Sequence, residues 1–584
     1  MRRPYSPVEL FCRMKLILLT SLLGIVGSPI VAFSQKPIEL AIRSEMDAKS
    51  NVAMHVELTF PGEAGGETVV RLPSEWGGQA QLYLALRDLD SDQAEILSGT
   101  GPSTRRLNHA PSAWITLRYQ VVVDENGPQF NGRGNDYRVH FRDRFLFALG
   151  ETWMVQPESV SDQSDVKVAI SFPEGIPWAS DLQHHLSGKR MLFEDLMESV
   201  LVAGDIRIVD AGSGVRLAIR GEIDSRNDAG WRDTFQKIAQ AQRDYWNANV
   251  EPFLVTIVIT PPVVRGSIFL GGTGRTDAFA FFSTNNADPP RLDQVMAHEM
   301  MHTWVPRRIG GMPLHEEQAD YWLSEGFTDW VSWRVLVRSG FWTPHDFVKA
   351  FNENLKDYDL SPVREVPNAQ IVSEFWRDRA TSDLPYRRGM LLATWWDYKV
   401  RQATNGKRDF DDVVLHMQQL ATLSEKKTTA AYLLAEAMHE MAGIDITSDL
   451  NEYVMQGRSI ELPVDLFTED CSLTWIERPT FHRGFDIEAT LANEKVISGV
   501  VEDGPAWRAG LRNGMSIVKL VGGEIGNSQV EIAYELKDGD QPLTLRWRPT
   551  GSTTERFRML KIRDDLSPDE LATLAARMGG SLPN

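Results

Sequence analysis

The sequence contains only two cysteines, Cys12 and Cys471, among its 584 residues. We predict that Cys12 is removed with an export signal, so the mature chain keeps one cysteine and cannot form an internal disulfide. Packed cores, and not covalent cross-links, must then stabilise the fold. Basic residues are also few, because 61 lysines and arginines face 80 aspartates and glutamates and the formal net charge is −19. This acidic balance argues against a nucleic-acid partner.

Long apolar runs are missing beyond the first 35 residues, so we predict no membrane span in the mature chain. Near the start, basic residues such as Arg2 precede a short apolar core over residues 16–26. Ala32 and Ser34 then offer small side chains at the two positions that a signal peptidase reads. We therefore predict a signal peptide over residues 1–34 and a periplasmic or extracellular mature protein. An uncleaved membrane anchor is the alternative.

An H-E-x-x-H motif runs from His298 to His302. Residues i and i+4 share one face of a helix, so both histidines can present ring nitrogens to one zinc ion. Glu299 then lies beside the metal, where a carboxylate can take a proton from water. Apolar residues around the motif predict a helix that ends before Pro306. The alternative is a surface helix with two incidental histidines.

A third zinc ligand must come from further along the chain, because Arg308 stands where some zinc peptidases carry a third histidine. The apolar stretch 321–330 predicts a helix that carries Glu325 and Asp329 on one face. A buried carboxylate needs a cation or a donor. We expect Glu325 to complete a site for one Zn²⁺ per chain, and Asp329 to accept from the far nitrogen of a ligand histidine. Gly326 would allow close packing; an exposed helix glutamate is the alternative for Glu325.

The stretch HEMMHTWVPRRI followed by WLSEGFTDW resembles the glycyl aminopeptidase family of gluzincin metallopeptidases. That resemblance implies a zinc-dependent peptidase with peptide or protein substrates, a distal glutamate ligand and a C-terminal PDZ domain. It also implies an edge strand within residues 269–282 that pairs with the substrate backbone. Tyr386, in a segment similar to the family's tyrosine-and-glycine segment, is a candidate donor to the reaction oxyanion. A packing role is the alternative for Tyr386.

The chain departs from the family just before the zinc helix. Members usually carry a glycine-rich segment that ends in Glu-His, and in related aminopeptidases a glutamate there holds the substrate's amino terminus. Residues 271–277 read Gly-Gly-Thr-Gly-Arg-Thr-Asp instead. Asp277 offers a replacement anion, but Arg275 opposes it. The departure leaves open whether the enzyme trims amino termini or cuts inside chains.

The predicted fold class is multidomain α+β. Alternating β-branched segments predict an all-β domain over residues 35–171. A thermolysin-like zinc metallopeptidase domain is expected over 172–465, a PDZ domain over 468–562 and a helical tail over 563–584. No pattern in the sequence indicates an oligomeric state.

The PDZ prediction depends on His-Arg-Gly-Phe-Asp-Ile at 482–487 and on a glycine-rich segment at 500–518. We expect Gly484 and Phe485 to belong to a peptide-binding turn and strand, with a helix over 529–536 on the other side of a groove. Three functions fit these observations: an aminopeptidase that removes small amino-terminal residues, a PDZ-directed endopeptidase, or a catalytically idle zincin that binds peptides. An intact Glu299 argues against the idle protein, since binding alone needs no base.

Overall fold

A computed structural model describes residues 36–46, 52–123, 130, 136–187, 190–263, 267–275, 277–313, 316–424 and 428–579. The predicted signal peptide, residues 1–34, lies outside the described residues. From Ile38 onward the chain forms one compact unit. None of the described helices is long and apolar enough to cross a membrane.

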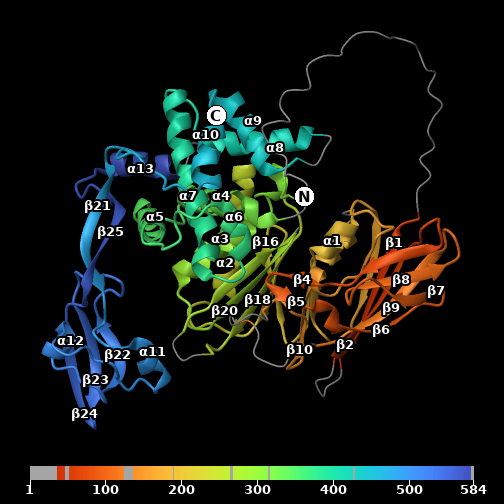
Figure 1. The fold of residues 1–584 in the computed structure, drawn as a ribbon, viewed down its shortest axis with the longest axis horizontal. Coiled ribbons are helices and arrows are strands. Elements are labelled where there is room, and N and C mark those ends of the chain that lie inside the picture. Colours follow the sequence, from red (N-terminus) through yellow and green to blue (C-terminus); the bar gives the residue numbers. More distant parts are fainter. Residues whose placement is uncertain are drawn as a thin grey trace, which may run out of the picture. The chain divides into compact units, whose positions relative to one another are not determined.

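The N-terminal part is built from β-sheets, as predicted (Figure 1). One five-stranded sheet has the order β13-β1-β2-β9-β6, and a four-stranded sheet has the order β12-β3-β8-β7. Burial alternates along β9, which is the half-buried pattern that its sequence predicts. The strands are β1 (Ile38–Met46), β2 (Val52–Pro61), β3 (Glu67–Arg71), β6 (Leu86–Asp90), β7 (Ala94–Ser98), β8 (Thr104–His109), β9 (Trp114–Val121), β12 (Gln156–Pro157) and β13 (Val166–Ser171). A two-stranded hairpin, β4 (Glu75–Trp76) with β5 (Gln79–Ala80), extends from them.

A third sheet contains strands on both sides of residue 171, the predicted end of the all-β domain. Its order is β10 (His140–Arg142), β11 (Phe145–Leu149), β15 (Val200–Gly204) and β14 (Trp178–Ser180). All five residues of β11 are buried, and β15, later in the chain, pairs along its whole length. The short helix α1 (Phe193–Met197) precedes β15. The β-rich part therefore ends near Gly204, because a strand this apolar needs partners on both sides.

The central sheet of the catalytic part has the order β16-β17-β18-β20-β19. Its strands are β16 (Arg207–Gly212), β17 (Val215–Arg220), β18 (Phe253–Thr260), β19 (Leu270–Gly274) and β20 (Ala278–Thr284), with helix α2 (Asp228–Trp246) between β17 and β18. Alternate residues of β18 pack into two different hydrophobic cores. One core lies between the sheet and the helices, and the other includes residues of β11 and β15. The sheet is therefore covered on both faces, by helices and by the third N-terminal sheet, and β19 forms one edge.

The helices that carry the site follow this sheet. They are α3 (Pro289–Met301), α4 (Tyr321–Arg338), α5 (Pro344–Asp359), α6 (Asn368–Glu374), α7 (Arg379–Ala403), α8 (Phe410–Leu423) and α9 (Ala430–Ala442). Helices α4 and α7 cross closely at Gly326 and Gly389, where a Cβ on Gly326 would overlap the Cα of Gly389. Gly326 thus allows α4 to pack closely against α7 next to Glu325, as its lack of a side chain predicts.

The C-terminal part contains a long two-stranded ribbon, β21 (Cys471–Phe481) with β25 (Thr550–Ile562). Beyond its far end lie α11 (Ile487–Ala492), α12 (Pro505–Arg508) and a sheet of β22 (Ser516–Gly522), β23 (Ile532–Asp538) and β24 (Gln541–Trp547). The helix predicted over 529–536 is therefore wrong. Ile532, Tyr534 and Leu536 alternate into a small core, which is the period of a strand and not of a helix.

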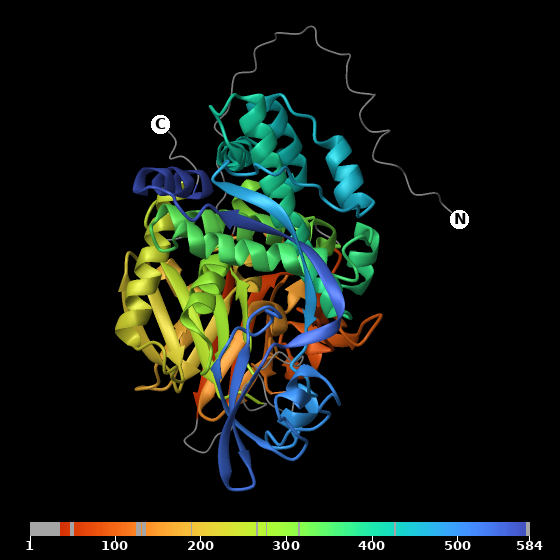
Figure 2. The same cartoon turned by 90° about the vertical axis from the view of Figure 1, so that its left-hand side faces the viewer.

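The base of the ribbon belongs to the core of the catalytic part. Figure 2 shows the ribbon passing beside the helices, and Asn352 of α5 bonds both main-chain groups of Leu560 at 2.7 and 2.9 Å. The tail forms α13 (Pro568–Gly579), with acidic residues in its first turn as predicted. Arg334 of α4 donates to the carbonyl of Met578 at 3.2 Å. Helix α13 therefore packs on the helix that carries Glu325.

Candidate metal centre and active site

Three side chains that could hold a metal ion converge between α3 and α4. His298 lies in α3, His302 directly follows the last residue of that helix, and Glu325 lies one turn into α4. His302 keeps a right-handed helical backbone, so the i, i+4 relation to His298 survives the end of the helix. Pro289 starts α3 at a position where its missing N–H costs no hydrogen bond.

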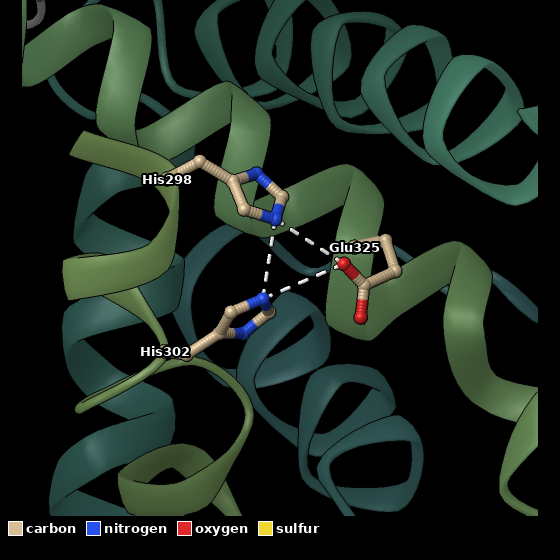
Figure 3. A group of neighbouring side chains, drawn as sticks. All are labelled: His298, His302 and Glu325. Carbon is tan, nitrogen blue, oxygen red and sulfur yellow. Dashed lines mark hydrogen bonds and ion pairs between the residues drawn. The ribbon is translucent and has the colours of Figure 1, made fainter. Parts of the chain in front are cut away.

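The ligand atoms form a nearly equilateral triangle (Figure 3). The two Nε2 atoms are 3.1 Å apart. Glu325 Oε2 lies 3.3 Å from His298 Nε2 and 3.4 Å from His302 Nε2. Tetrahedral ligands about 2.0–2.1 Å from a zinc ion are separated by about 3.3–3.4 Å. The spacing of this donor set therefore fits zinc.

Hydrogen bonds orient both imidazole rings. His298 Nδ1 lies 2.9 Å from Asp329 Oδ1, and His302 Nδ1 lies 2.9 Å from the carbonyl of Val305. Because a carbonyl or carboxylate oxygen only accepts, each Nδ1 donates a proton, and Nε2 is the nitrogen of each ring that remains for a metal ion. Two Nε2 atoms beside one carboxylate oxygen call for positive charge between them, either a bound cation or added protons.

Electrostatics around the triad support this interpretation. Burial opposes ionisation of Glu325, yet the two histidines hold the pKa of Glu325 far below its usual range. Burial lowers the pKa of His298, but Asp329 and Glu325 raise it by more, so the net shift is upward. The pocket is thus built to hold positive charge at this point.

Glu299 lies beside the triad and is 8% exposed. Burial raises the pKa of Glu299 above its usual range, and the two histidines partly offset that shift. A Cβ on Gly272 of β19 would lie 2.6 Å from the Glu299 carboxyl carbon. The glycine therefore lets the edge strand approach the general-base candidate.

Tyr386 stands over His298, with ring centroids 5.9 Å apart and planes 26° from parallel. It lies in the interior of α7. Burial, followed by the charges of Glu325 and Glu299, raises the pKa of Tyr386 well above its usual value. The phenol stays protonated and remains a hydrogen-bond donor at neutral pH.

The residues around the glycine-rich segment differ from their sequence-based interpretation. Arg275 does not leave its charge unpaired near Asp277, because its Nη1 lies 2.6 Å from both carboxylate oxygens of Glu151. Asp277 is 7% exposed and lies 4.0 Å from His184. Asp277 is therefore buried on the inner side of the segment, which does not favour an amine-binding role.

Sequence reasoning missed Tyr137, which reaches the site from the β-rich part. Its hydroxyl donates to the carbonyl of Gly272 at 3.0 Å, across 135 positions of sequence. Burial, followed by the charge of Glu299, raises the pKa of Tyr137. No local pattern marks this residue, since the contact depends on how two distant segments pack.

Gly484 and Phe485 are both buried in the C-terminal module. Gly484 has φ +86° and a Cβ there would lie 2.5 Å from Ala506 Cβ, while Phe485 is 3% exposed and packs against Tyr534. The strand expected after Gly484 is instead the short helix α11. The conformation of Gly484 thus serves the packing of the module, and Phe485 contributes to its core.

Comparisons with known proteins agree with this site. Residues 291–405 match the sequence pattern of the M61 glycyl aminopeptidase family. An aminopeptidase N family protein from Idiomarina loihiensis has a similar fold, with a TM-score of 0.62, 14% identity, and coverage of 93% of this chain and 100% of that one. An M1 zinc metallopeptidase from Deinococcus radiodurans aligns with a TM-score of 0.46 and 13% identity over 73% of this chain and 94% of that one.

A search of curated protein sequences finds no match. The family match spans both histidines, Glu299 and Glu325, which are the residues that the geometry brings together. The match, the fold and the donor set together support a zinc metallopeptidase, a hydrolase that acts on peptide bonds.

Proposed function

We propose that the protein is an exported, zinc-dependent aminopeptidase that removes small residues from the amino termini of peptides. The observation that carries the proposal is the triangle of His298, His302 and Glu325, with sides of 3.1–3.4 Å, beside the buried Glu299. The description of the matching family as glycyl aminopeptidases supports the preference for small residues. Export is proposed from the predicted signal peptide over residues 1–34.

The side chains have separate roles in this mechanism. His298, His302 and Glu325 would hold the zinc ion, which would supply a Lewis acid to polarise the scissile carbonyl and acidify water. Glu299 takes the proton of the attacking water and returns it to the leaving amine. Tyr386 donates a hydrogen bond to the oxyanion that develops at the carbonyl. Asp329 holds the His298 ring in its tautomer and orientation.

A peptide-library digest, read by mass spectrometry with and without a chelator, tests the activity. The proposal predicts chelator-sensitive loss of single amino-terminal residues. Internal cuts would instead support the endopeptidase, and binding without any cleavage would support the idle zincin.

Two matched variants test the assignment of the metal ligands. Glu325→Gln removes a ligand and should lower zinc content, whereas Glu299→Gln should keep zinc and lose about 10²–10⁴-fold in kcat. Metal analysis of both purified variants distinguishes the roles. Full zinc content and normal turnover in Glu325→Gln would exclude it as the third ligand.

A further inference from the structure

The edge strand β19 presents main-chain groups to the side that faces away from β20. Phe269 accepts a bond from Thr284 and Arg275 donates one to Ala278, so the odd-numbered residues point toward β20. Hydrogen-bonded and outward-pointing residues alternate in an antiparallel pair. The N–H and C=O groups of Leu270, Gly272 and Gly274 therefore point to the free edge.

Two of the three outward carbonyls already have donors. Tyr137 donates its hydroxyl to Gly272 at 3.0 Å, and Arg275 donates its Nε–H to Gly274 at 2.7 Å. Arg275 is itself fixed by the bidentate pair with Glu151 and lies over the ring of Trp76 at 4.8 Å. Among the described residues, Leu270 is the outward-pointing residue whose carbonyl has no such donor, so an added strand can pair there with both an N–H and an unoccupied C=O.

The β4–β5 hairpin reinforces this blocked end. Trp76 packs edge-on against Tyr137 with centroids 5.1 Å apart. A Cβ on Gly77 would lie 2.8 Å from the Tyr137 ring, and one on Gly78 would lie 3.1 Å from Trp376. The hairpin thus contacts Tyr137, which holds the edge strand, and Trp376, which follows α6 among the helices.

We propose that Tyr137 and Arg275, locked by this hairpin, stop a bound peptide at the C-terminal half of β19 and make the site specific for a chain end. A peptide that adds to β19 in antiparallel direction has its amino end there, next to Gly272 and Glu299. The glycine-rich segment lacks the glutamate that binds the substrate's amino terminus in related aminopeptidases. In this protein the blocked edge of β19 selects amino termini instead. The inference rests on the proposed aminopeptidase activity and assigns its specificity.

The test compares two peptides of eight residues that differ only in acetylation of the amino terminus. Wild type should trim the free peptide and leave the acetylated one nearly intact. Tyr137→Phe keeps the ring but frees the Gly272 carbonyl, and Trp376→Ala removes the far support of the hairpin. In each variant the ratio of kcat/KM on the acetylated peptide to kcat/KM on the free peptide should rise about tenfold, because the peptide can form additional main-chain hydrogen bonds with β19.

Controls separate this effect from general damage. Tyr83→Phe removes the hydroxyl of a partly buried tyrosine elsewhere in the β-rich part. Trp475→Ala truncates a tryptophan that is 52% exposed, against 54% for Trp376. Zinc content and the unfolding midpoint report whether each variant is intact. An unchanged ratio in intact Tyr137→Phe and Trp376→Ala overturns the inference while wild-type trimming still supports the proposed function. Absence of any chelator-sensitive trimming by wild type rejects the proposed function itself.

Discussion

At the scale of single residues, the candidate site depends on which nitrogen of each histidine is left free. Asp329 and the Val305 carbonyl each accept from an Nδ1–H, so both Nε2 atoms face Glu325. Only the first of these acceptors is a side chain. Asp329 is therefore the orienting group that mutation can change without touching a ligand.

We predict that Asp329→Asn weakens zinc affinity by roughly 10–100-fold while the protein stays folded. An asparagine side chain can turn its NH₂ group toward His298 Nδ1. The variant therefore lacks the carboxylate that fixes the tautomer of His298. Competition with a chelator measures the affinity, and the thermal midpoint checks folding. Unaltered affinity would leave Asp329 as a buried carboxylate without a role at the metal.

At the scale of elements, the position of Glu325 depends on the crossing of α4 and α7. The two glycines at the crossing face each other, and a Cβ on Gly389 would overlap the carbonyl oxygen of Trp322. We predict that Gly326→Ala separates the helices, costs about 1–3 kcal/mol of stability and lowers zinc affinity, because Glu325 is its neighbour.

Gly101→Ala is a suitable control for this change, because no atom lies within 4 Å of a Cβ at Gly101 and its φ is not positive. Gly340→Ala is unsuitable, because Gly340 has φ +70° and an alanine there would be strained. Equilibrium unfolding and zinc titration of Gly326→Ala and Gly101→Ala measure the two effects. A Gly326→Ala protein that matches wild type in both would show that the crossing tolerates a methyl group.

A second element, the 3₁₀ helix over Asp181–Ser187, makes stability depend on pH. Burial raises the pKa of Asp181 to about 7. The folded state then keeps a proton that the unfolded state releases above its ordinary pKa of 3.8, so this contribution to stability declines as pH rises from about 4 to about 7.

We predict that Asp181→Asn is more stable than wild type at pH 8, by of the order of 1–4 kcal/mol, and gains little at pH 4. Its amide oxygen can still accept from the Val200 N–H, which is 2.9 Å from Asp181 in the native protein. Unfolding midpoints at both pH values measure the difference, with Asp538→Asn at the exposed end of β23 as a control for charge. Parallel pH profiles of Asp181→Asn and wild type would contradict the prediction.

At the scale of the whole molecule, the C-terminal part is only partly an independent module. Arg558 of β25 pairs with Asp359 of α5 at 2.6 Å, and their side chains are 7% and 2% exposed. Ile460 and Phe467 in the preceding connection also belong to the catalytic core. A deletion of everything after Asp465 would leave Asp359 buried without its partner, which costs roughly 3–5 kcal/mol.

Removal of residues 483–548 alone, with a glycine-serine turn joining β21 to β25, leaves that ion pair and every zinc ligand in place. We predict normal zinc content and a kcat/KM on a dipeptide amide within about twofold of wild type. If the module recruits substrates, only a ten-residue peptide loses rate. Equal losses on both substrates would show that the module shapes the active site.

Local pattern was enough for those features whose physical cause is local. The i, i+4 spacing of the two histidines and of Glu325 and Asp329 puts each pair on one helix face, and alternation predicted strands such as β9. Turn and cap residues predicted the start of α13. Family resemblance, not spacing, pointed to Tyr386.

Other features depended on how distant segments pack. The stretch 529–536 is a strand because β22 and β24 flank it, and the β-rich part ends near Gly204 because β15 pairs with β11. Tyr137 meets Gly272 across 135 positions. The sequence by itself determined which faces of α3 and α4 carry His298, His302 and Glu325, because the spacing along each face is set within one helix. Only the tertiary structure decided which side chains close the edge of β19, because that choice depends on packing between segments that no local pattern connects.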